Sequence, residues 1–470
     1  MKSLIKGSRR LPLASLILVA LAGPTTTSSV ASAATSALDT SGAWPTAPGA
    51  TVRFYTNCDD DGLGSLRQAI SASASGDSVR ASPTLSCSTI TLQTPLIFGQ
   101  QDLDIRGNGK GRPTITAAAT VTDGLIRHLG AGQLNLQFLS LEGGRKYKDD
   151  GQAKGGCVYG AGNVGLNVTS VSGCTAKGVG FQQGIGGGVF SQGLTSLRLS
   201  EVSGNVATSS GGAYASGGGM YAVGGVTLDR SVIAGNATDT TGNSWGGGFT
   251  TPGGAQIVNS ALINNSARVS GGAHIHPPSA TPISIINTTI SGNSATRVGG
   301  LTCVGTTTIL SSTISNNTSQ DGSSGGRIIG GGLDLGAGNH VIASTIITGN
   351  YAGGEGFATS INLSSSTGAT LAGDHDHISG STLALPNGTI TTASQLLPLA
   401  LNGSSRPTHA LSPTDLDVDA GVAPVGQTYD QRGFPFLRSV GPGTDIGAYE
   451  YDPDYIFRDG FDTAFGGPPG

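Results

Sequence analysis

Charged side chains are scarce in this sequence, because Asp, Glu, Lys and Arg make up only 11% of its 470 residues. Globular domains usually contain roughly 25%, and disordered chains of low hydrophobicity are normally more charged still. The formal net charge is -4 and the pI is near 5.9. The low charge therefore favours a folded chain, and without a basic surface nucleic acid is not an expected partner.

Long apolar runs and helical periodicity are also missing. Beyond the first residues no run reaches the roughly 18 apolar residues of a membrane-spanning helix, so no transmembrane span is predicted. Apolar residues do not recur at i, i+3, i+4 and i+7, which argues against helical repeats.

Glycine, in contrast, is abundant, with 78 of 470 residues. Much of it belongs to a phrase that occurs eight times at intervals of 24 to 33 residues and ends at Gly144, Cys174, Asn205, Asn236, Asn265, Asn293, Asn317 and Asn350. This period is too short for a domain and too long for one strand. Each copy is therefore interpreted as one coil of a solenoid.

Every copy keeps an apolar residue at two fixed places. Eight positions before the end stand Leu136, Leu166, Leu197, Leu228, Ile257, Ile285, Ile309 and Ile342, and three before it stand Leu141, Val171, Val202, Ile233, Leu262, Ile290, Ile314 and Ile347. Short Ile-, Val-, Leu- and Thr-rich runs between turns predict strands. We therefore predict an all-β fold, a right-handed parallel β-helix (single-stranded solenoid) with stacked apolar columns.

Polar positions repeat as well. The residue before each end is Gly or Asn, which predicts a turn with positive φ once per coil. Five positions before the end the residue is Ser or Thr in every copy except the first, which has Leu139, and this column is expected to hydrogen-bond along the axis. A Gly-Gly pair precedes a further column that is predicted to face inward: Cys157, Val189, Met220, Phe249, Ala273, Leu301 and Leu333.

The N-terminal residues resemble an export signal. Lys2, Lys6, Arg9 and Arg10 precede the apolar run Leu11 to Leu21, and Ala31-Ser32-Ala33 offers small residues for cleavage. Residues 1–33 are predicted to be a signal peptide cleaved near Ala33, followed by a linker over 34–50. The mature protein is expected to be secreted or held at the cell surface or outer membrane.

Five cysteines fit an oxidising compartment. A disulfide between Cys58 and Cys87 is predicted, and closing a loop of about 30 residues would stabilise the fold by roughly 3 kcal/mol. Pairing of Cys157 with Cys174 is left open. Cys303 is expected to be a buried inert thiol, because no His or Asp accompanies it at that level of the solenoid.

The open ends of a solenoid need caps. Gly64 to Ile70 predicts a short amphipathic helix, so 51–125 is assigned to the N-terminal cap and first coils and 126–365 to the repeats. An irregular C-terminal cap is expected over 366–451 and a flexible tail over 452–470. Capped ends favour a monomer.

Two segments resemble known families. "DDGLGSLRQAI" from Asp60 to Ile70 is similar to the CSLREA opening of secreted bacterial β-helix proteins, although here a cysteine, Cys58, precedes the phrase. "LLPLALNGSSRPTHALSPTDLDVDAG", "DQRGFP" and "DIGAYEY", between Leu396 and Tyr451, resemble the choice-of-anchor Q domain. The resemblance implies a right-handed β-helix at the cell surface or outside the cell, and it implies no activity.

Carboxylates that could catalyse sugar cleavage are few. Between Gly156 and Asn350 the sequence has only Glu201, Asp229, Asp239, Asp321 and Asp334. An acid and base pair needs two carboxyl groups within roughly 5 to 9.5 Å, and no two of these share a suitable place. No catalytic residue is predicted, and Asp229 is expected to form an ion pair with Arg198.

The column two places after the Gly-Gly pair is expected to face outward, and it holds Val158, Phe190, Tyr221, Thr250, His274, Thr302 and Asp334. Phe190 and Tyr221 on adjacent rungs would suit a flat platform for a sugar ring, although cross-strand stacking is the favoured alternative. The candidate carbohydrate-binding residues are Phe190, Tyr221, His274 and Asp334.

Metal sites have weaker support. His274 and His276 lack a third ligand. The string Asp374-His375-Asp376-His377 has donors that suit zinc, but a polar connection between the last coil and the cap is favoured. No metal and no cofactor are predicted.

Two classes of function fit these features. The favoured hypothesis is an exported, non-catalytic rod that is adhesive, structural or bound to an extracellular polysaccharide or a host or cell-surface glycan. The alternative is a polysaccharide lyase or glycoside hydrolase on a pectate-lyase-like β-helix.

Overall fold

The computed structural model describes residues 49–109, 111–239, 242–278, 281–321, 323–324, 327–353 and 361–454. The predicted signal peptide, nearly all of the predicted linker and most of the predicted tail lie outside these residues. No helix in the described part of the chain is long and apolar enough to cross a membrane.

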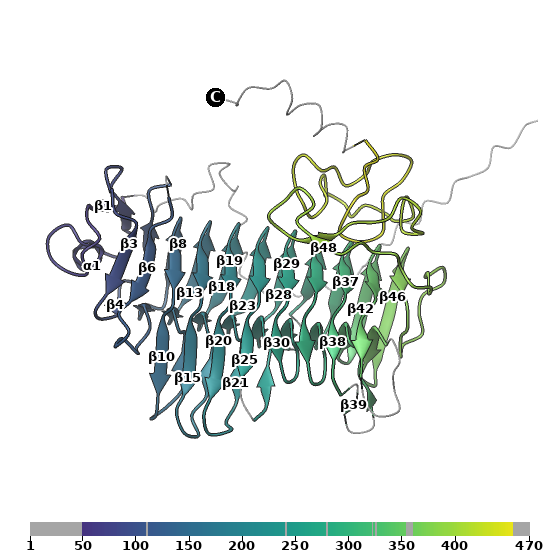
Figure 1. Ribbon diagram of the computed structural model, residues 1–470, viewed down its shortest axis with the longest axis horizontal. Helices are drawn as coiled ribbons and strands as arrows, with labels where there is room; N and C mark the ends of the chain where they lie inside the picture. Colours follow the sequence, from purple (N-terminus) through teal and green to yellow (C-terminus); the bar gives the residue numbers. More distant parts are fainter. Residues whose placement is uncertain are drawn as a thin grey trace, which may run out of the picture. The chain divides into compact units, whose positions relative to one another are not determined.

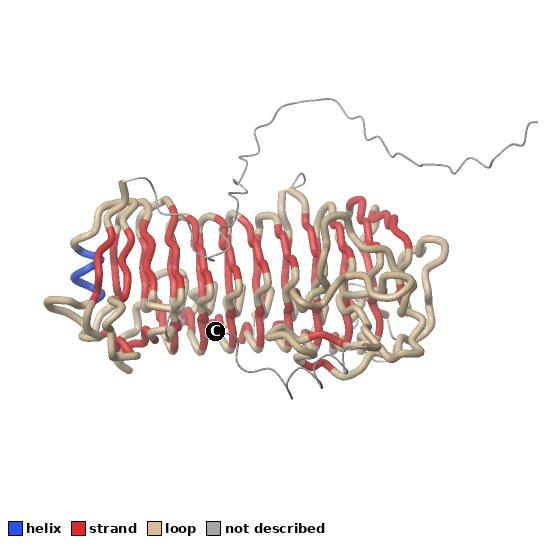
Figure 2. Tube along the Cα trace, turned by 90° about the horizontal axis from the view of Figure 1, so that it is seen from above, coloured by secondary structure: helices blue, strands red, loops and turns tan. Residues whose placement is uncertain are grey.

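The chain winds into a parallel β-helix whose successive coils stack strand on strand (Figures 1 and 2). Between Gln133 and Thr251 each coil passes through sheets that we name A, B, D, E and C in that order, whereas the coils described after Thr251 have no strand in sheet E. All strand pairs within these five sheets are parallel. The predicted fold class, an all-β parallel β-helix with a short helical cap, is confirmed.

Two long sheets meet at one corner of the coil. Sheet A contains β1 (Val52–Tyr55), β2 (Ser78–Ala81), β5 (Leu103–Arg106), β8 (Gln133–Gln137), β13 (Asn163–Asn167), β18 (Leu194–Arg198), β23 (Gly225–Asp229), β28 (Ala255–Val258), β32 (Ile283–Ile286), β36 (Thr307–Leu310), β42 (Gly338–Ala343) and β46 (Ala369–Asp374). Sheet B contains β3 (Thr89–Leu92), β6 (Thr114–Ala117), β9 (Ser140–Glu142), β14 (Ser170–Ser172), β19 (Glu201–Ser203), β24 (Val232–Ala234), β29 (Ala261–Ile263), β33 (Thr289–Ser291), β37 (Thr313–Ser315), β43 (Ile346–Thr348) and β47 (His377–Ile378).

Three further sheets close each coil. Sheet C contains β4 (Leu96–Phe98), β7 (Ile126–His128), β12 (Val158–Gly160), β17 (Val189–Ser191), β22 (Met220–Ala222), β27 (Phe249–Thr251), β31 (Ala273–Ile275), β35 (Leu301–Cys303), β41 (Leu333–Leu335) and β45 (Leu363–Ser365). Sheet D contains β10 (Arg145–Lys148), β15 (Thr175–Gly178), β20 (Val206–Ser209), β25 (Ala237–Asp239), β30 (Ser266–Ala267), β34 (Ser294–Ala295), β38 (Thr318–Ser319) and β44 (Tyr351–Ala352). Sheet E contains β11 (Ala153–Lys154), β16 (Gly184–Ile185), β21 (Ala215–Ser216) and β26 (Ser244–Trp245).

Two antiparallel pairs lie outside these sheets. They are β39 (Ser323–Ser324) with β40 (Arg327–Ile328), and β48 (Leu399–Ala400) with β49 (Thr408–His409).

The predicted apolar columns form the core. In sheet A, Leu228 pairs with Ile257 and Ile257 with Ile285, and all three are fully buried. The second column stacks in the same way in sheet B, where Ile233 pairs with Leu262. Parallel strands lie about 4.8 Å apart, so identical positions necessarily form continuous internal columns.

The column predicted to follow the Gly-Gly pairs is wrong at its first member, Cys157. Val158, not Cys157, pairs with Val189, and Cys157 takes the place that Gly188 has in the next coil. Its side chain bonds to Cys174, so the pairing that the sequence left open is a disulfide. The predicted Cys58–Cys87 disulfide is also present, and Cys303 is a buried free thiol, as expected.

Hydrogen-bonded ladders run along the axis inside the coils. The Ser and Thr column bonds as predicted: the backbone N–H of Ser200 donates to Oγ of Ser231, and that of Ser231 donates to Oγ of Ser260. A second ladder, of asparagine side chains, links Asn205, Asn236, Asn265, Asn293, Asn317, Asn350 and Asn362. These bonds satisfy polar groups that would otherwise be buried without partners.

The turns explain the repeated glycines and reveal a second bend. The predicted position before each phrase end has positive φ throughout, for example 61° at Gly235 and 56° at Asn264. The corner between sheets A and B is also left-handed, although it is occupied by residues such as Val168, Leu199 and Arg230, with φ of 50°, 48° and 49°. Branched residues rarely adopt this conformation, so the stacked neighbours must hold it.

The N-terminal end carries α1 (Leu66–Ser71), the helix that the sequence predicted. Ser65 caps it by accepting a hydrogen bond from the backbone N–H of Gln68, while Oε1 of Gln68 accepts from the N–H of Gly64. The arrangement is a variant of the capping box, in which Gln68 accepts from the residue before the N-cap and not from the N-cap itself. Leu66, Ala69 and Ile70 are buried against the first coils.

The predicted C-terminal cap has two structural roles. Leu383 and Leu385 pack on the core at the last coil, next to bridges that join the segment after β47 to β45 and β47. Residues 396–451, which we call the side module, instead fold back over the side of the β-helix (Figure 1, yellow). Their contacts include a hydrogen bond from Oγ1 of Thr289 to Oε1 of Gln431 at 2.6 Å.

The motifs that carry the C-terminal resemblance form the polar interior of the side module. Arg432 of "DQRGFP" bonds to buried Asp430 and lies 3.9 Å from the ring centroids of both Phe436 and Tyr449. Arg438 pairs with buried Glu450 at 2.8 Å. Such bonds compensate the cost of burying these charges, so the motif residues have a structural role.

Candidate carbohydrate-binding groove

Coil length creates a groove along one side of the β-helix. Ten residues join β20, which ends at Ser209, to β22, which begins at Met220. Only five join β30 to β31, between Ala267 and Ala273. The longer connections provide the strands of sheet E, which stand beside sheet C as a wall, and the shorter ones provide none.

A run of three glycines lets the chain turn sharply from sheet E into sheet C. Gly217 has a φ of 64°, and a Cβ at this position would lie 2.1 Å from the carbonyl oxygen of Met220. Gly246 is equally confined, with a φ of 61° and the same distance to the carbonyl oxygen of Phe249. No side chain fits at these positions, so the angle between the two sheets depends on glycine.

The groove has a volume of about 350 Å³. Its lining is made of aromatic, hydroxyl, amide and imidazole side chains: Gln152, Gln183, Ile185, Tyr214, Ser216, Tyr221, Trp245, Thr250, His274 and His276. The Tyr214 and Trp245 rings lie 5.1 Å apart, and the Trp245 and His274 rings 6.5 Å apart. Aromatic surface with a few convergent polar groups is typical of a small-molecule site.

The residues that line the groove include no carboxylate and no Lys or Arg. Burial, the neighbouring His276 and Arg297 together lower the pKa of His274 to about 4. His274 is therefore neutral at neutral pH. The groove presents uncharged hydrogen-bonding groups and aromatic faces, and it contains no acid and base pair for glycosidic cleavage.

The rings of Phe190 and Tyr221 stack on one another along the axis, which is the alternative that the sequence favoured, and do not form a flat platform. Tyr159, not Val158, is in register with Phe190, and the Tyr159, Phe190 and Tyr221 rings are nearly parallel, with centroids 5.5 and 5.9 Å apart. Phe190 is buried, with the amine of Lys154 4.8 Å from its ring centroid. Phe190 lies in the same outward column as Tyr221 and is not part of the core cluster, but stacking along the axis covers both faces of its ring, so it is not accessible to a ligand.

The other candidate residues have different positions. Tyr221 and His274 line the groove. Asp334 lies two strands beyond His274 in sheet C, is buried, and accepts a hydrogen bond from Oγ of Ser364. Asp334 is therefore not part of the groove.

The Asp374 to His377 string does not converge on one point. Asp374 and His375 are exposed, whereas Asp376 and His377 are buried. His377 instead lies near Asp415 and Asp417, with possible ligand atoms of all three within 4.8 Å of one another. This cluster is a second candidate for a metal site.

The hydrogen bonds of His377 argue against metal binding. Its Nδ1 bonds to Oδ1 of Asp417 and its Nε2 to the carbonyl oxygen of Thr392, both at 2.8 Å. Although burial alone would lower the pKa of His377, the hydrogen bond and charge of Asp417 raise it. Both ring nitrogens are therefore already engaged in hydrogen bonds, and a metal would have to displace one of them.

Tyr214 and Trp245 were not predicted as groove residues. They belong to the connections between the repeated phrases, where no fixed position identifies them. The spacing from each phrase end to the end of the following Gly-Gly pair, 12 to 14 residues after Gly144, Cys174, Asn205 and Asn236 but seven after Asn265 and Asn293, is the signal that could have indicated an extra wall.

Comparison with known proteins assigns this chain to no family. No family model matches the sequence, and no curated protein matches it. Among solved structures, the crystal structure of pectate lyase Pel9A matches with a TM-score of 0.47 and 12% identity, covering 86% of this chain and 97% of that chain. The class of protein that the coordinates define is a parallel β-helix protein with a side groove.

Proposed function

We propose that this protein is an exported, non-catalytic β-helix protein that binds an uncharged segment of an extracellular polysaccharide or cell-surface glycan in the groove. The observation that carries the proposal is the uncharged lining, in which Tyr214, Tyr221 and Trp245 stand among amide and imidazole groups. Aromatic rings offer apolar faces to sugar C–H groups, and the polar groups can bond to hydroxyls.

Export is supported by two disulfides, which persist in oxidising compartments. The N-terminal signal-like segment and the resemblances to CSLREA and choice-of-anchor Q proteins agree with secretion or retention at the cell surface. Caps at both ends of the β-helix support a monomer.

A glycan array with the purified mature protein, followed by calorimetry with the best ligand, tests the proposal. Trp245→Ala and Tyr221→Ala should each weaken binding roughly tenfold or more, because they remove large contact surfaces. Tyr214→Ala should weaken it as well. Tyr351→Ala is the matched control for Tyr214→Ala, since the two tyrosines are 51% and 49% exposed and Tyr351 lies outside the groove.

Absence of any array ligand would contradict the proposal. Equal affinity of the wild type and Trp245→Ala would also contradict it, provided that circular dichroism shows the same fold for both.

A further inference from the structure

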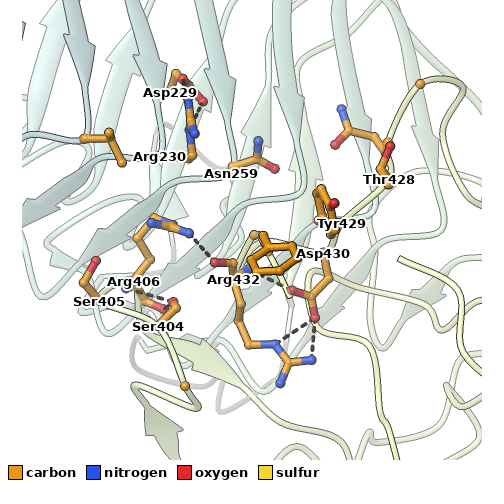
Figure 3. A pocket seen from close by; sticks show the side chains of 16 residues that line it. Asp229, Arg230, Asn259, Ser404, Ser405, Arg406, Thr428, Tyr429, Asp430 and Arg432 are labelled. Atoms are coloured by element: carbon orange, nitrogen blue, oxygen red, sulfur yellow. Dashed lines mark hydrogen bonds and ion pairs between the residues drawn. The ribbon is translucent and has the colours of Figure 1, made fainter. Parts of the chain in front are cut away.

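A second cavity lies between the β-helix and the side module (Figure 3). Its volume is about 650 Å³, within the range of ligand sites. On the β-helix side it is bounded by the corner between sheets A and B, at Leu199, Arg230 and Asn259. Loops within 403–406 and 426–434 of the side module bound the other side.

The residues at the corner between sheets A and B form the side of the cavity that belongs to the β-helix. Leu199, Arg230 and Asn259 are successive corner residues with φ of 48°, 49° and 51°. Since the same left-handed bend recurs at each rung, their side chains project from one edge. The cavity therefore needs both the stacked corners and the loops of the side module.

Positive charge exceeds negative charge here. Asp229 accepts three hydrogen bonds from Arg230, from Nε to both carboxylate oxygens and from Nη2 to Oδ2. Its Oδ2 also lies 3.7 Å from Nε of Arg198, which confirms the ion pair that the sequence predicted. Asp229 thus already balances more than one guanidinium.

Arg406 adds another guanidinium. It is buried, and its Nε and Nη2 donate to the carbonyl oxygens of Gln431 and Arg432. Carbonyl groups fix its position but do not neutralise its charge. Burial lowers the pKa of Arg406, the charge of Arg230 lowers it further, and the charges of Asp229 and Asp430 raise it.

The positive charge of Arg432 is balanced by a carboxylate of its own. Its Nε and Nη2 bond to Oδ2 of Asp430 at 2.9 and 2.6 Å. The cavity lining therefore holds three guanidinium groups, those of Arg230, Arg406 and Arg432, against the two carboxylates of Asp229 and Asp430, and Arg198 lies beside Asp229.

We propose that this cavity binds an anionic saccharide, whose carboxylate or sulfate group is held by Arg230 and Arg406. Guanidinium groups suit both anions, because their donors match paired oxygens. The remaining lining contains hydroxyl and amide side chains, Asn259, Ser404, Ser405, Gln427 and Thr428, and two aromatic rings, Tyr429 and Phe434. These groups complement sugar hydroxyls and a ring face. The site is separate from the groove and takes the opposite kind of ligand, a charged one.

Calorimetry with three oligosaccharide probes of similar length tests the proposal: an oligomer of glucuronic acid, a sulfated neutral oligomer, and the same oligomer without sulfate. We expect the acidic or the sulfated probe to bind, with an affinity that falls as salt is added, and the neutral probe to bind at this site far more weakly. Comparison of the two anionic probes identifies which anion is preferred.

Two substitutions, one that removes a positive charge and one that removes a negative charge, should change the affinity in opposite directions. Arg230→Gln should lower the affinity on the order of 10- to 100-fold, because one charge-assisted contact is lost. Asp229→Asn should raise it severalfold, because the competing carboxylate is neutralised. Arg112→Gln, at an exposed arginine outside the cavity, is the matched control. Arg230 is preferred to Arg406 for substitution, because Arg406 also holds the loop of the side module.

The proposal is overturned if neither anionic probe binds the wild type. It is also overturned if Arg230→Gln leaves the affinity unchanged, or if Asp229→Asn lowers it. Trp245→Ala should not alter this binding, so failure of the groove and failure of this cavity are distinguishable.

Discussion

Asn205 and Asn236 lie one above the other inside the β-helix, with Nδ2 of Asn205 donating to Oδ1 of Asn236 at 2.9 Å. The backbone N–H of Asn205 donates to the same oxygen at 3.0 Å. Each asparagine thus joins the side chain and the backbone of its neighbour. Because both residues are fully buried, water cannot replace either bond.

Asn265→Ala should therefore be strongly destabilising. Oδ1 of Asn265 accepts from both the backbone N–H and Nδ2 of Asn236, while Nδ2 of Asn265 donates to the carbonyl oxygen of Ile233. Buried groups left without partners cost roughly 1–3 kcal/mol each, so we expect a loss of about 2–4 kcal/mol in urea unfolding. Asn243→Ala, at an exposed asparagine, should change stability by less than about 0.5 kcal/mol. A similar loss in both variants would contradict the role of the ladder.

Asp376→Asn should stabilise the protein at alkaline pH. Burial raises the pKa of Asp376 from 3.8 to about 8, with a further increase from Asp374, although the N–H of Thr345 donates to it. The folded state therefore holds a proton that the unfolded state loses, and the free energy of unfolding falls as pH rises from about 4 to about 8. Removing the acid should add on the order of a few kcal/mol near pH 8 and little near pH 4.

Thermal unfolding across this pH range measures the effect. Asp239→Asn is the control, because Asp239 is exposed and takes no part in the shift at Asp376. If the two variants show the same pH dependence as the wild type, Asp376 is not the group responsible.

Cys303 should resist thiol reagents in the native protein. Burial, assisted by the nearby Asp334, raises the pKa of its thiol to about 12, so almost no thiolate is present near neutral pH. We expect a chromogenic disulfide reagent to detect close to zero thiols in the folded protein and about one after unfolding without reductant. Fast labelling of the native state would show that the core opens at β35.

The purified mature protein should not depolymerise pectin, alginate, chondroitin or peptidoglycan. The groove lining has no carboxylate, whereas glycoside hydrolysis normally uses two, and it has no Lys or Arg that could neutralise a uronate or remove its proton in an elimination. Assays of reducing ends and of the ultraviolet absorbance of unsaturated products should stay at the level of the buffer. Turnover that is lost in Trp245→Ala would favour the lyase or hydrolase alternative.

The interior was predictable because it is periodic. Ile257 and Ile285 occupy the same place in successive coils, and parallel pairing brings such positions into register. The Gly or Asn turn followed from the left-handed preference of those residues. The corner at Val168 gave no such signal, because stacking holds a conformation that valine does not prefer.

The candidate site was predicted only in part. Tyr221 and His274 were found because they occupy a repeated column. Trp245 was missed because it lies in a connection whose path depends on coil length. The burial of Phe190 was missed because the column was assigned Val158, whereas Tyr159 is the residue in register and covers the second face of the ring.

The wall of the groove is built from one short strand per long coil, each with its own glycine turn. Duplicating a unit such as the one from Asn205 to Asn236 would lengthen the groove by one rung, about 4.8 Å, without a new loop. Recombination between like units would therefore change the length of the groove in whole-number steps, and with it the length of any ligand that it could hold.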